Sequence, residues 1–264
     1  MGAQDISWLN LILGYLLLII PVMIFRYYQT GMIKPMLISM LRMSLQLFLV
    51  GLYLKYLFRL NNPWINIAWV LIMILVTAYT IVSRTRLPRR LLFIPVFLAL
   101  ILSISLVDLF LLGVVLKLDF IFEARYLIPL TGMLIGNSLN NTVIGVDHFY
   151  NCIRQQQNTY RFALANGASQ SEAVHIFIRD SIRKAMNPTI ASTAVMGIVS
   201  LPGMMTGQIL GGSDPSVAIK YQILIMIMIF VSSLVTLWLS ILFCNRKAFD
   251  KFGNPDGRIM KISH

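Results

Sequence analysis

Amide and thioether side chains gather in two stretches of an otherwise apolar chain. In residues 129–141, three asparagines are spaced three or four residues apart, so they share one face of a helix. In residues 198–212, a Pro-Gly pair is followed by two methionines, a threonine and a glutamine. Amides are costly in lipid and point into a bundle or along a pathway, and thioethers bind soft metal ions. The candidate metal or pathway ligands are Met133, Asn137, Met204, Met205 and Gln208, and the candidate gating residues are Gln46, Asn140, Asn141, Pro202, Gly203 and Thr206.

Each of these residues also has a purely structural interpretation. The asparagines can hydrogen-bond to neighbouring helices and do nothing more, and Gly132 and Gly136 form a G-x-x-x-G pair that suits close helix packing. Methionine is a common packing residue, so most of the 15 methionines are expected in the core or against lipid. The three histidines are too far apart along the chain to suggest a metal site.

Pro202 and Gly203 predict that the membrane span around them bends or breaks. Proline removes a backbone donor and glycine weakens a helix, and further glycines follow at 207, 211 and 212. Backbone that is not helical survives at membrane depth only where protein or a water-filled cavity covers it. The segment therefore predicts either a pathway wall or a kinked helix end packed by small residues.

A polar loop at residues 151–184 separates two apolar runs and has to lie in water. Residues 154–165 and 171–184 can both be helical, with Gly167 between them. Ser169 can cap the second helix, and Glu172 stands at capping-box spacing. A surface helix, a turn and a rising helix form a shape that a motor subunit could push, although an ordinary cytoplasmic loop is the alternative. The candidate coupling residues are Arg161, Ala165, Gly167, Ala168, Ser169 and Glu172.

The elements that position these residues are predicted to be membrane-spanning helices. Apolar residues make up 58% of the chain and charged residues 12%, against about 25% charged in soluble domains. A span needs about 20 apolar residues. The segments that meet this length are 7–26, 35–58, 65–83, 91–114, 126–147, 186–210 and 219–243. We therefore expect an all-α, multi-pass bundle of about seven transmembrane helices, in one domain over residues 1–264.

The basic residues predict the orientation of the bundle. With the N-terminus outside and the C-terminus inside, 17 of the 22 Lys and Arg residues are cytoplasmic, as the positive-inside rule requires. The cytoplasmic loops are then 26–34, 84–90 and 151–185, followed by the tail from Asn245 with its predicted turn at 254–257. This distribution explains the net charge of +12 without nucleic acid, and no basic run with interleaved aromatics suggests a nucleic-acid partner.

Catalytic motifs are absent from the sequence. There is no phosphate-binding P-loop, no H-E-x-x-H and no G-x-S-x-G. We expect no enzymatic activity and no cofactor bound by this chain, so ATP, if used, binds a separate subunit. The two cysteines, Cys152 and Cys244, are isolated and are expected to be reduced.

Four segments, 42–51, 129–141, 161–173 and 197–223, together resemble the FetB/YbbM-type family of iron-export ABC transporter permeases, which also includes plant aluminium-tolerance permeases. The longest match runs from Ser200 to Gly212 and continues with Asp214-Pro215 and Tyr221-Gln222-Ile223. The loop around Gly167 resembles the EAA loop of ABC permeases, except that Arg161 stands where that motif begins with Glu.

The resemblance implies a homodimeric permease of the inner (cytoplasmic) membrane that binds a separate ABC ATP-binding subunit and exports metal ions, with iron as the suggested cargo. Two other functions remain open from the residues. An ion-coupled secondary transporter would need a buried acid or histidine as a proton relay. A membrane scaffold that transports nothing would need no broken polar span.

Overall fold

Helices are the regular secondary structure of the part of the chain described by the computed structural model, residues 6–85, 87–250 and 253–254, and no β-strand forms there. The predicted turn at 254–257 and four basic residues of the orientation argument, Arg86, Lys251, Arg258 and Lys261, fall wholly or partly outside these ranges. The helices are α1 (Trp8–Tyr15), η1 (Leu16–Leu18), α2 (Ile19–Tyr27), α3 (Ile33–Leu60), α4 (Pro63–Arg84), α5 (Arg89–Leu109), η2 (Phe110–Val115), α6 (Ala124–Gln155), α7 (Gln157–Ala165), α8 (Gln170–Ala194), α9 (Gly203–Leu210) and α10 (Pro215–Ala248).

Long apolar helices confirm a multi-pass membrane bundle. In the described ranges, 5 helical segments are long and apolar enough to cross a membrane: Trp8–Tyr27, Ile33–Leu60, Pro63–Arg84, Leu91–Val115 and Pro215–Ala248. The other two predicted spans lie in α6 and across α8 and α9, which carry more polar residues. Polar residues in a spanning helix have to be covered by protein or water, so these two elements are where a functional site is expected.

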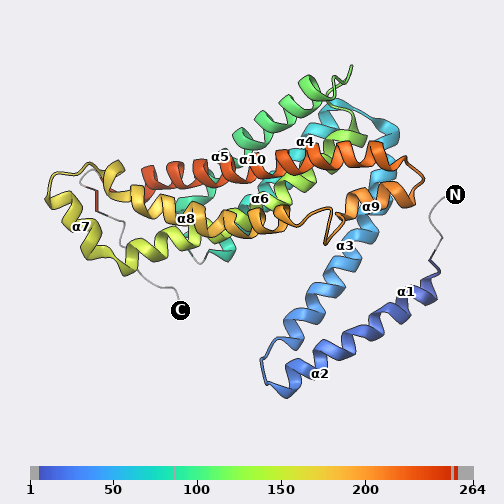
Figure 1. The fold of residues 1–264 in the computed structure, drawn as a ribbon, viewed down its shortest axis with the longest axis horizontal. Helices are drawn as coiled ribbons and strands as arrows, with labels where there is room; N and C mark the ends of the chain where they lie inside the picture. Colours follow the sequence, from blue (N-terminus) through green and yellow to red (C-terminus); the bar gives the residue numbers. More distant parts are fainter. Residues whose placement is uncertain (1–5, 86, 251–252, 255–264) are drawn as a thin grey trace.

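Helices α4, α5, α6, α8 and α10 pack around the main core. Figure 1 shows α10 running the length of the bundle beside α6 and α8. Hydroxyl groups join three of these helices in the interior: Ser103 on α5 donates to the carbonyl of Ser232 on α10 at 3.1 Å, and Thr236 donates to Ser103 at 2.9 Å. Ser138 on α6 lies 3.4 Å from the Ser232 hydroxyl. Burying these groups is tolerable because each has a partner.

The N-terminal hairpin, α1 to α3, diverges from this bundle. Figure 1 shows its blue helices at an angle below α10, and no residue of α1 or α2 is buried. The hairpin contacts the bundle at one end of α3, where Tyr53 packs on Trp69 and Leu57 lies against Ala124 and Ile128. Most of α3 therefore presents its side chains to whatever surrounds the protomer.

Asparagines hold the junction of the hairpin and the bundle. Asn61 ends α3 in the left-handed conformation, with φ of 38°, and its side chain accepts from the backbone N–H of Ala124 at 3.0 Å. The Asn66 amide donates to the carbonyl of Phe122 at 2.8 Å. Both bonds tie the region of the α3–α4 turn to the start of α6, because each satisfies a backbone group at or just before the first residue of α6.

The predicted span at 186–210 is broken, as Pro202 and Gly203 suggested. Helix α8 continues through Pro188 and ends at Ala194, residues 195–202 are not helical, and α9 starts at Gly203. Gly197 adopts φ of 90°, which favours glycine, and its N–H donates to the Ser200 carbonyl at 2.9 Å. Figure 1 shows α9 continuing away from α8 before the chain turns back into α10.

Candidate functional site

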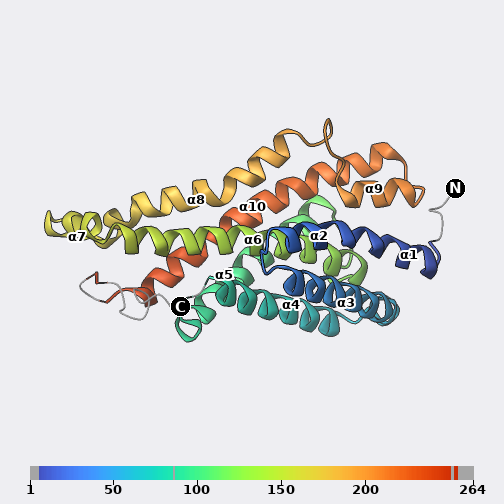
Figure 2. The same cartoon turned by 90° about the horizontal axis from the view of Figure 1, so that it is seen from below.

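The polar loop forms an elbow at one end of the bundle, which we define as α7, the turn at 166–169 and the first turn of α8. Figure 2 shows α7 at the end of the molecule opposite α9 and α1. Gly167 adopts φ of 88° in the turn, and a Cβ added there would meet nothing within 4 Å. The predicted turn is therefore present, and it lies in open space where another protein could reach it.

The predicted capping box at Ser169 is confirmed. The Glu172 N–H donates to the Ser169 hydroxyl at 3.3 Å, and the Ser169 N–H donates to Glu172 Oε2 at 2.7 Å. Hydrogen bonds from the Ser169 hydroxyl and N–H lower the pKa of the exposed Glu172. The box fixes where α8 begins and so sets the angle between α7 and α8.

A buried tyrosine that the sequence did not single out anchors α7. Tyr160 is 1% exposed, packs against Phe177 of α8 and Phe249, and donates to the carbonyl of Gly253 at 2.6 Å. The opposite side of α7 is open, and Phe162 is 71% exposed there. An aromatic ring at that exposure outside a membrane span suits a protein contact. The candidate residues Arg161 and Ala165 are exposed on the same short helix.

The break between α8 and α9 opens a cavity of about 600 Å³ against α10. Three methionines, Met196, Met205 and Met226, contribute to its wall, and Gln222 of α10 is the buried polar side chain among its lining residues. Gln222 is 7% exposed and its Oε1 has no hydrogen-bond partner. An unpaired amide oxygen beside thioethers can accept a hydrogen bond or contact a cation.

The candidate pathway residues are only partly brought together. Pro202 and Met205 line this cavity. Met204 and Met133 instead pack against the main core, Thr206 donates to the Pro202 carbonyl at 3.2 Å within α9, and Gln208 is half-buried with its Oε1 unpaired. The sequence did not predict three wall residues: Met196 in the break, and Gln222 and Met226 on the facing helix α10. Of these, only Gln222 lies in a segment that the family resemblance had already marked.

The asparagines of α6 divide between the interior and an exposed face. Asn141 is buried and its amide donates to Thr189 of α8 at 3.1 Å, so it joins the two helices. Asn137 donates to the carbonyl of Met133 at 2.9 Å and is exposed, and Asn140 and Gly136 are exposed beside it. Gly136 meets no other helix, since a Cβ there would contact nothing within 4 Å. We refer to Gly136, Asn137 and Asn140 as the polar face of α6.

Arg42 and Gln46 of α3 are likewise exposed. They share a helix face with Tyr53 and Leu57, since the spacing of four, seven and four residues keeps all of them within one side of a helix. Tyr53 and Leu57 pack on the bundle, so Arg42 and Gln46 point into the angle between hairpin and bundle. Polar groups there need a polar partner outside the described protomer.

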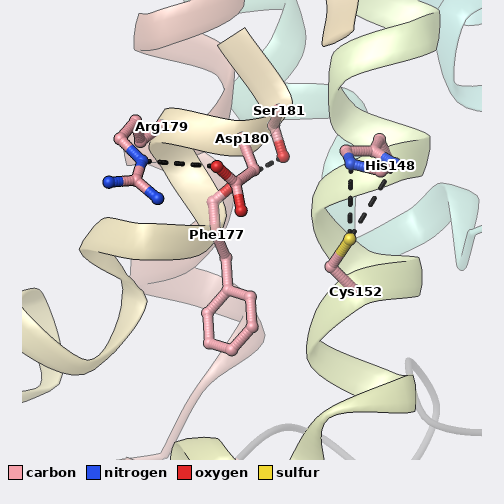
Figure 3. A network of polar contacts seen from close by, with 6 residues as sticks. All are labelled: His148, Cys152, Phe177, Arg179, Asp180 and Ser181. Atoms are coloured by element: carbon pink, nitrogen blue, oxygen red, sulfur yellow. Dashed lines mark hydrogen bonds and ion pairs between the residues drawn. The ribbon is translucent and has the colours of Figure 1, made fainter. Parts of the chain in front are cut away.

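A small polar network lies where α6 and α8 run side by side toward the elbow, as Figure 3 shows. Cys152 Sγ is 3.4 Å from His148 Nε2, and Arg179 forms an ion pair with Asp180 at 3.3 Å. Burial, and then the charge of Asp180, raise the pKa of the Cys152 thiol, which therefore stays protonated at neutral pH. In the described residues, no group of three or more His, Cys, Asp and Glu side chains could hold a metal ion.

Comparisons with known proteins match nearly the whole chain. The model of a family described as "Uncharacterised protein family (UPF0014)" matches residues 8–249. The "Probable iron export permease protein FetB" of Escherichia coli is 34% identical over 87% of this chain and 87% of its own length. "Protein ALUMINUM SENSITIVE 3" of Arabidopsis thaliana is 32% identical over 94% and 92%, and "UPF0014 membrane protein YjkA" of Bacillus subtilis is 29% identical over 87% and 90%. No solved structure matches the chain.

Proposed function

The chain belongs to the UPF0014 family of membrane proteins, and from this premise we propose that it is the membrane-spanning subunit of an ATP-driven metal-ion exporter. The name of the Escherichia coli relative, a probable iron export permease, supports export and suggests iron as the cargo. The chain has no P-loop, so a separate ABC ATP-binding subunit would supply the energy. The protein itself would catalyse no reaction.

The exposed elbow is the observation that carries this proposal. Helix α7 and the turn at Gly167 project from one end of the bundle, while Tyr160 holds α7 against α8. A force on α7 would therefore be passed along α8, which runs without interruption from Gln170 to Ala194 and ends at the break. The proposed relay thus joins the ATPase contact to the cavity by one rigid helix, with the elbow and C-terminus in the cytoplasm and the N-terminus outside.

The pathway would run between two copies of this chain. The polar face of α6 and the pair Arg42 and Gln46 are exposed where lipid would make them costly, and a second copy would cover both. Closure of the two ATPase subunits would tilt α8 and change the shape of the break cavity. Gln222 and the methionines around it would then exchange contacts with the passing ion.

The ATPase contact is tested by placing a charge on the elbow, at the end of α7 or in the turn that follows it. Ala165→Glu, Gly167→Glu and Ala168→Glu are each expected to abolish co-purification of the cognate ATPase while leaving membrane insertion intact. A matched control, Ser213→Glu, adds the same charge in the exposed turn between α9 and α10 at the other end of the bundle. Undiminished ATPase binding by the three elbow variants would refute the proposal that the elbow contacts the ATPase.

One observation favours a second candidate, an ion-coupled transporter that needs no motor. Asp108 is a buried acid within the spanning segment Leu91–Val115, the type of residue that such a transporter requires. Flux measurements in vesicles separate the two functions. Metal-ion movement that requires both ATP and the ATPase supports the exporter, and movement driven by a pH gradient across vesicles that contain this chain alone supports the alternative.

A further inference from the structure

Asp108 occupies an unusual position inside the bundle, away from the elbow and the break. It lies near the end of α5 and is 6% exposed. The Thr131 hydroxyl of α6 donates to Asp108 Oδ2 at 2.7 Å, and Oδ1 has no partner. The ion pair found among the described side chains joins Arg179 to Asp180, so no described cation neutralises Asp108.

Asp108 lines a cavity of about 250 Å³ between α4, α5, η2 and the start of α6. Ser105 is the other polar residue in the wall, and the rest is apolar. The main apolar wall residues are Ile74, Ile104, Leu112, Ile121, Phe122 and Leu127. The cavity is large enough to hold water, and Asp108 and Ser105 supply polar partners for it.

Asp108 is the titratable residue among the side chains that line this cavity. Helix α4 contributes no charged residue before Arg84 at its far end. The connection after η2, the start of α6 and the start of α10 carry Lys117, Asp119, Glu123, Arg125, Tyr126, Lys220 and Tyr221, and none of these lines the cavity. The protonation of Asp108 is therefore controlled mainly by hydration and by Thr131.

An ionised carboxylate without a counter-charge is far more costly in such a place than the neutral acid. Oδ2 already accepts a hydrogen bond from the Thr131 hydroxyl. The unpaired Oδ1 is therefore the oxygen that carries the proton when Asp108 is neutral. The π-helix η2 begins two residues after Asp108, at Phe110. π-Helical segments often mark functional positions. Here η2 contributes Leu112 to the cavity wall, so part of that wall lacks the α-helical hydrogen-bond pattern.

We propose that Asp108 and Thr131 form a proton-binding site. Asp108 is neutral while the cavity is dry, and it transfers its proton to water when water enters the cavity. The O–H bond of the acid breaks, a hydronium ion forms, and the carboxylate keeps the Thr131 hydrogen bond. The ligand is a proton, so this inference is independent of the ATPase and of the exported ion.

Infrared difference spectroscopy of the full chain in lipid nanodiscs tests the site directly. At neutral pH the wild type is expected to show a protonated-carboxyl carbonyl band that Asp108→Asn, an isosteric variant, lacks. Asp119→Asn, an exposed acid on the connection before α6, keeps the band. Thr131→Val is expected to move the band to higher frequency, because the carbonyl loses its hydrogen-bond donor.

Water entry is tested by enlarging the cavity. Phe122→Ala removes part of the wall, and the carboxyl band is then expected to disappear at a lower pH than in the wild type. The proposal is overturned if the wild type shows no such band at neutral pH, or if Asp108→Asn retains it. An unchanged band in Thr131→Val would refute the pairing, and an unchanged pH response in Phe122→Ala would refute release to entering water.

Discussion

At the scale of single residues, the elbow depends on two hydrogen bonds between residues that stand three positions apart in the sequence. Ser169 and Glu172 satisfy each other's backbone N–H groups at the start of α8. Both residues are exposed, so the motif buries little surface, and its main effect is to fix where α8 begins and in which direction it runs. A side-chain change here alters the elbow without touching the core.

Ser169→Ala removes the hydroxyl that caps α8. The local opening free energy is expected to fall by about 1 kcal/mol, which makes amide hydrogen exchange at residues 170–173 roughly fivefold faster. Thr159→Ala, on the exposed side of α7, serves as the control and leaves this exchange unchanged. Equal exchange rates in Ser169→Ala and the wild type would show that the cap does not form in the membrane protein.

The pH dependence of the elbow follows from Glu172. Its pKa in the folded protein lies below the ordinary value of 4.5, because the hydroxyl and N–H of Ser169 favour the carboxylate. The contribution of Glu172 is therefore complete above the ordinary value and is lost as the pH falls through the lowered pKa. Exchange at residues 170–173 is expected to accelerate in that acidic window, and Glu172→Gln removes this acceleration.

At the scale of elements, Gly145 of α6 is the described glycine that lies tightest against a neighbouring helix, and that helix is α10. A Cβ at this position would overlap the side chain of Leu237, which is completely buried. The sequence drew attention to Gly132 and Gly136 instead, because they form the G-x-x-x-G spacing. That spacing cannot tell which glycine faces a neighbouring helix, and within the protomer the face at Gly136 is open.

Gly145→Ala is expected to destabilise the bundle by about 1–3 kcal/mol, because α6 or Leu237 has to move. Leu237→Ala alone creates a cavity, but the double variant should lose less than the sum of the two single losses, since the small side chain at 237 admits the new methyl group. Thermal unfolding in detergent measures all three. Gly14→Ala on α1, where an added Cβ would meet nothing within 4 Å, is the control and should not destabilise the bundle. Strict additivity of the Gly145 and Leu237 losses would contradict the contact.

The break between α8 and α9 shows how far local rules extend. Pro202 and Gly203 correctly predicted that the span is interrupted, because both residues disfavour a helix wherever they stand. They did not predict that α8 passes through Pro188 or that the helix stops as early as Ala194. Those limits depend on packing along α6 and α10, which overrides the local preference of one proline.

At the scale of the whole molecule, the diverging hairpin and the polar face of α6 are the features that support the proposed homodimer. Arg42, Gln46, Asn137 and Asn140 are all exposed in a protein whose surroundings are mostly lipid. Their partners would come from a second copy, which would fill the angle between hairpin and bundle. The proposed homodimer rests on this unmet polarity.

Cysteine cross-linking tests that assembly. In a Cys152→Ser background, Asn140→Cys on the polar face of α6 is expected to form a disulfide-linked dimer in membranes. Leu102→Cys on α5, where the Leu102 side chain is 53% exposed, should remain monomeric under the same oxidation. A dimer band of equal strength from both positions, or from Leu102→Cys alone, would contradict a homodimer formed along the polar face of α6.

Composition and local motifs were enough to predict a helical membrane bundle, an elbow with a capping box and a broken span. Each of these depends on neighbours along the chain: apolar run length, one serine and one glutamate, one Pro-Gly pair. Three features could be seen only in the folded chain, because each depends on how different helices pack. They are the pairing of Asp108 with Thr131, the exposure of Asn140 beside the buried Asn141, and the cavity at Gln222. Whether a polar group meets a partner, a cavity or lipid is set by helix packing, and packing brings together positions that no local spacing relates.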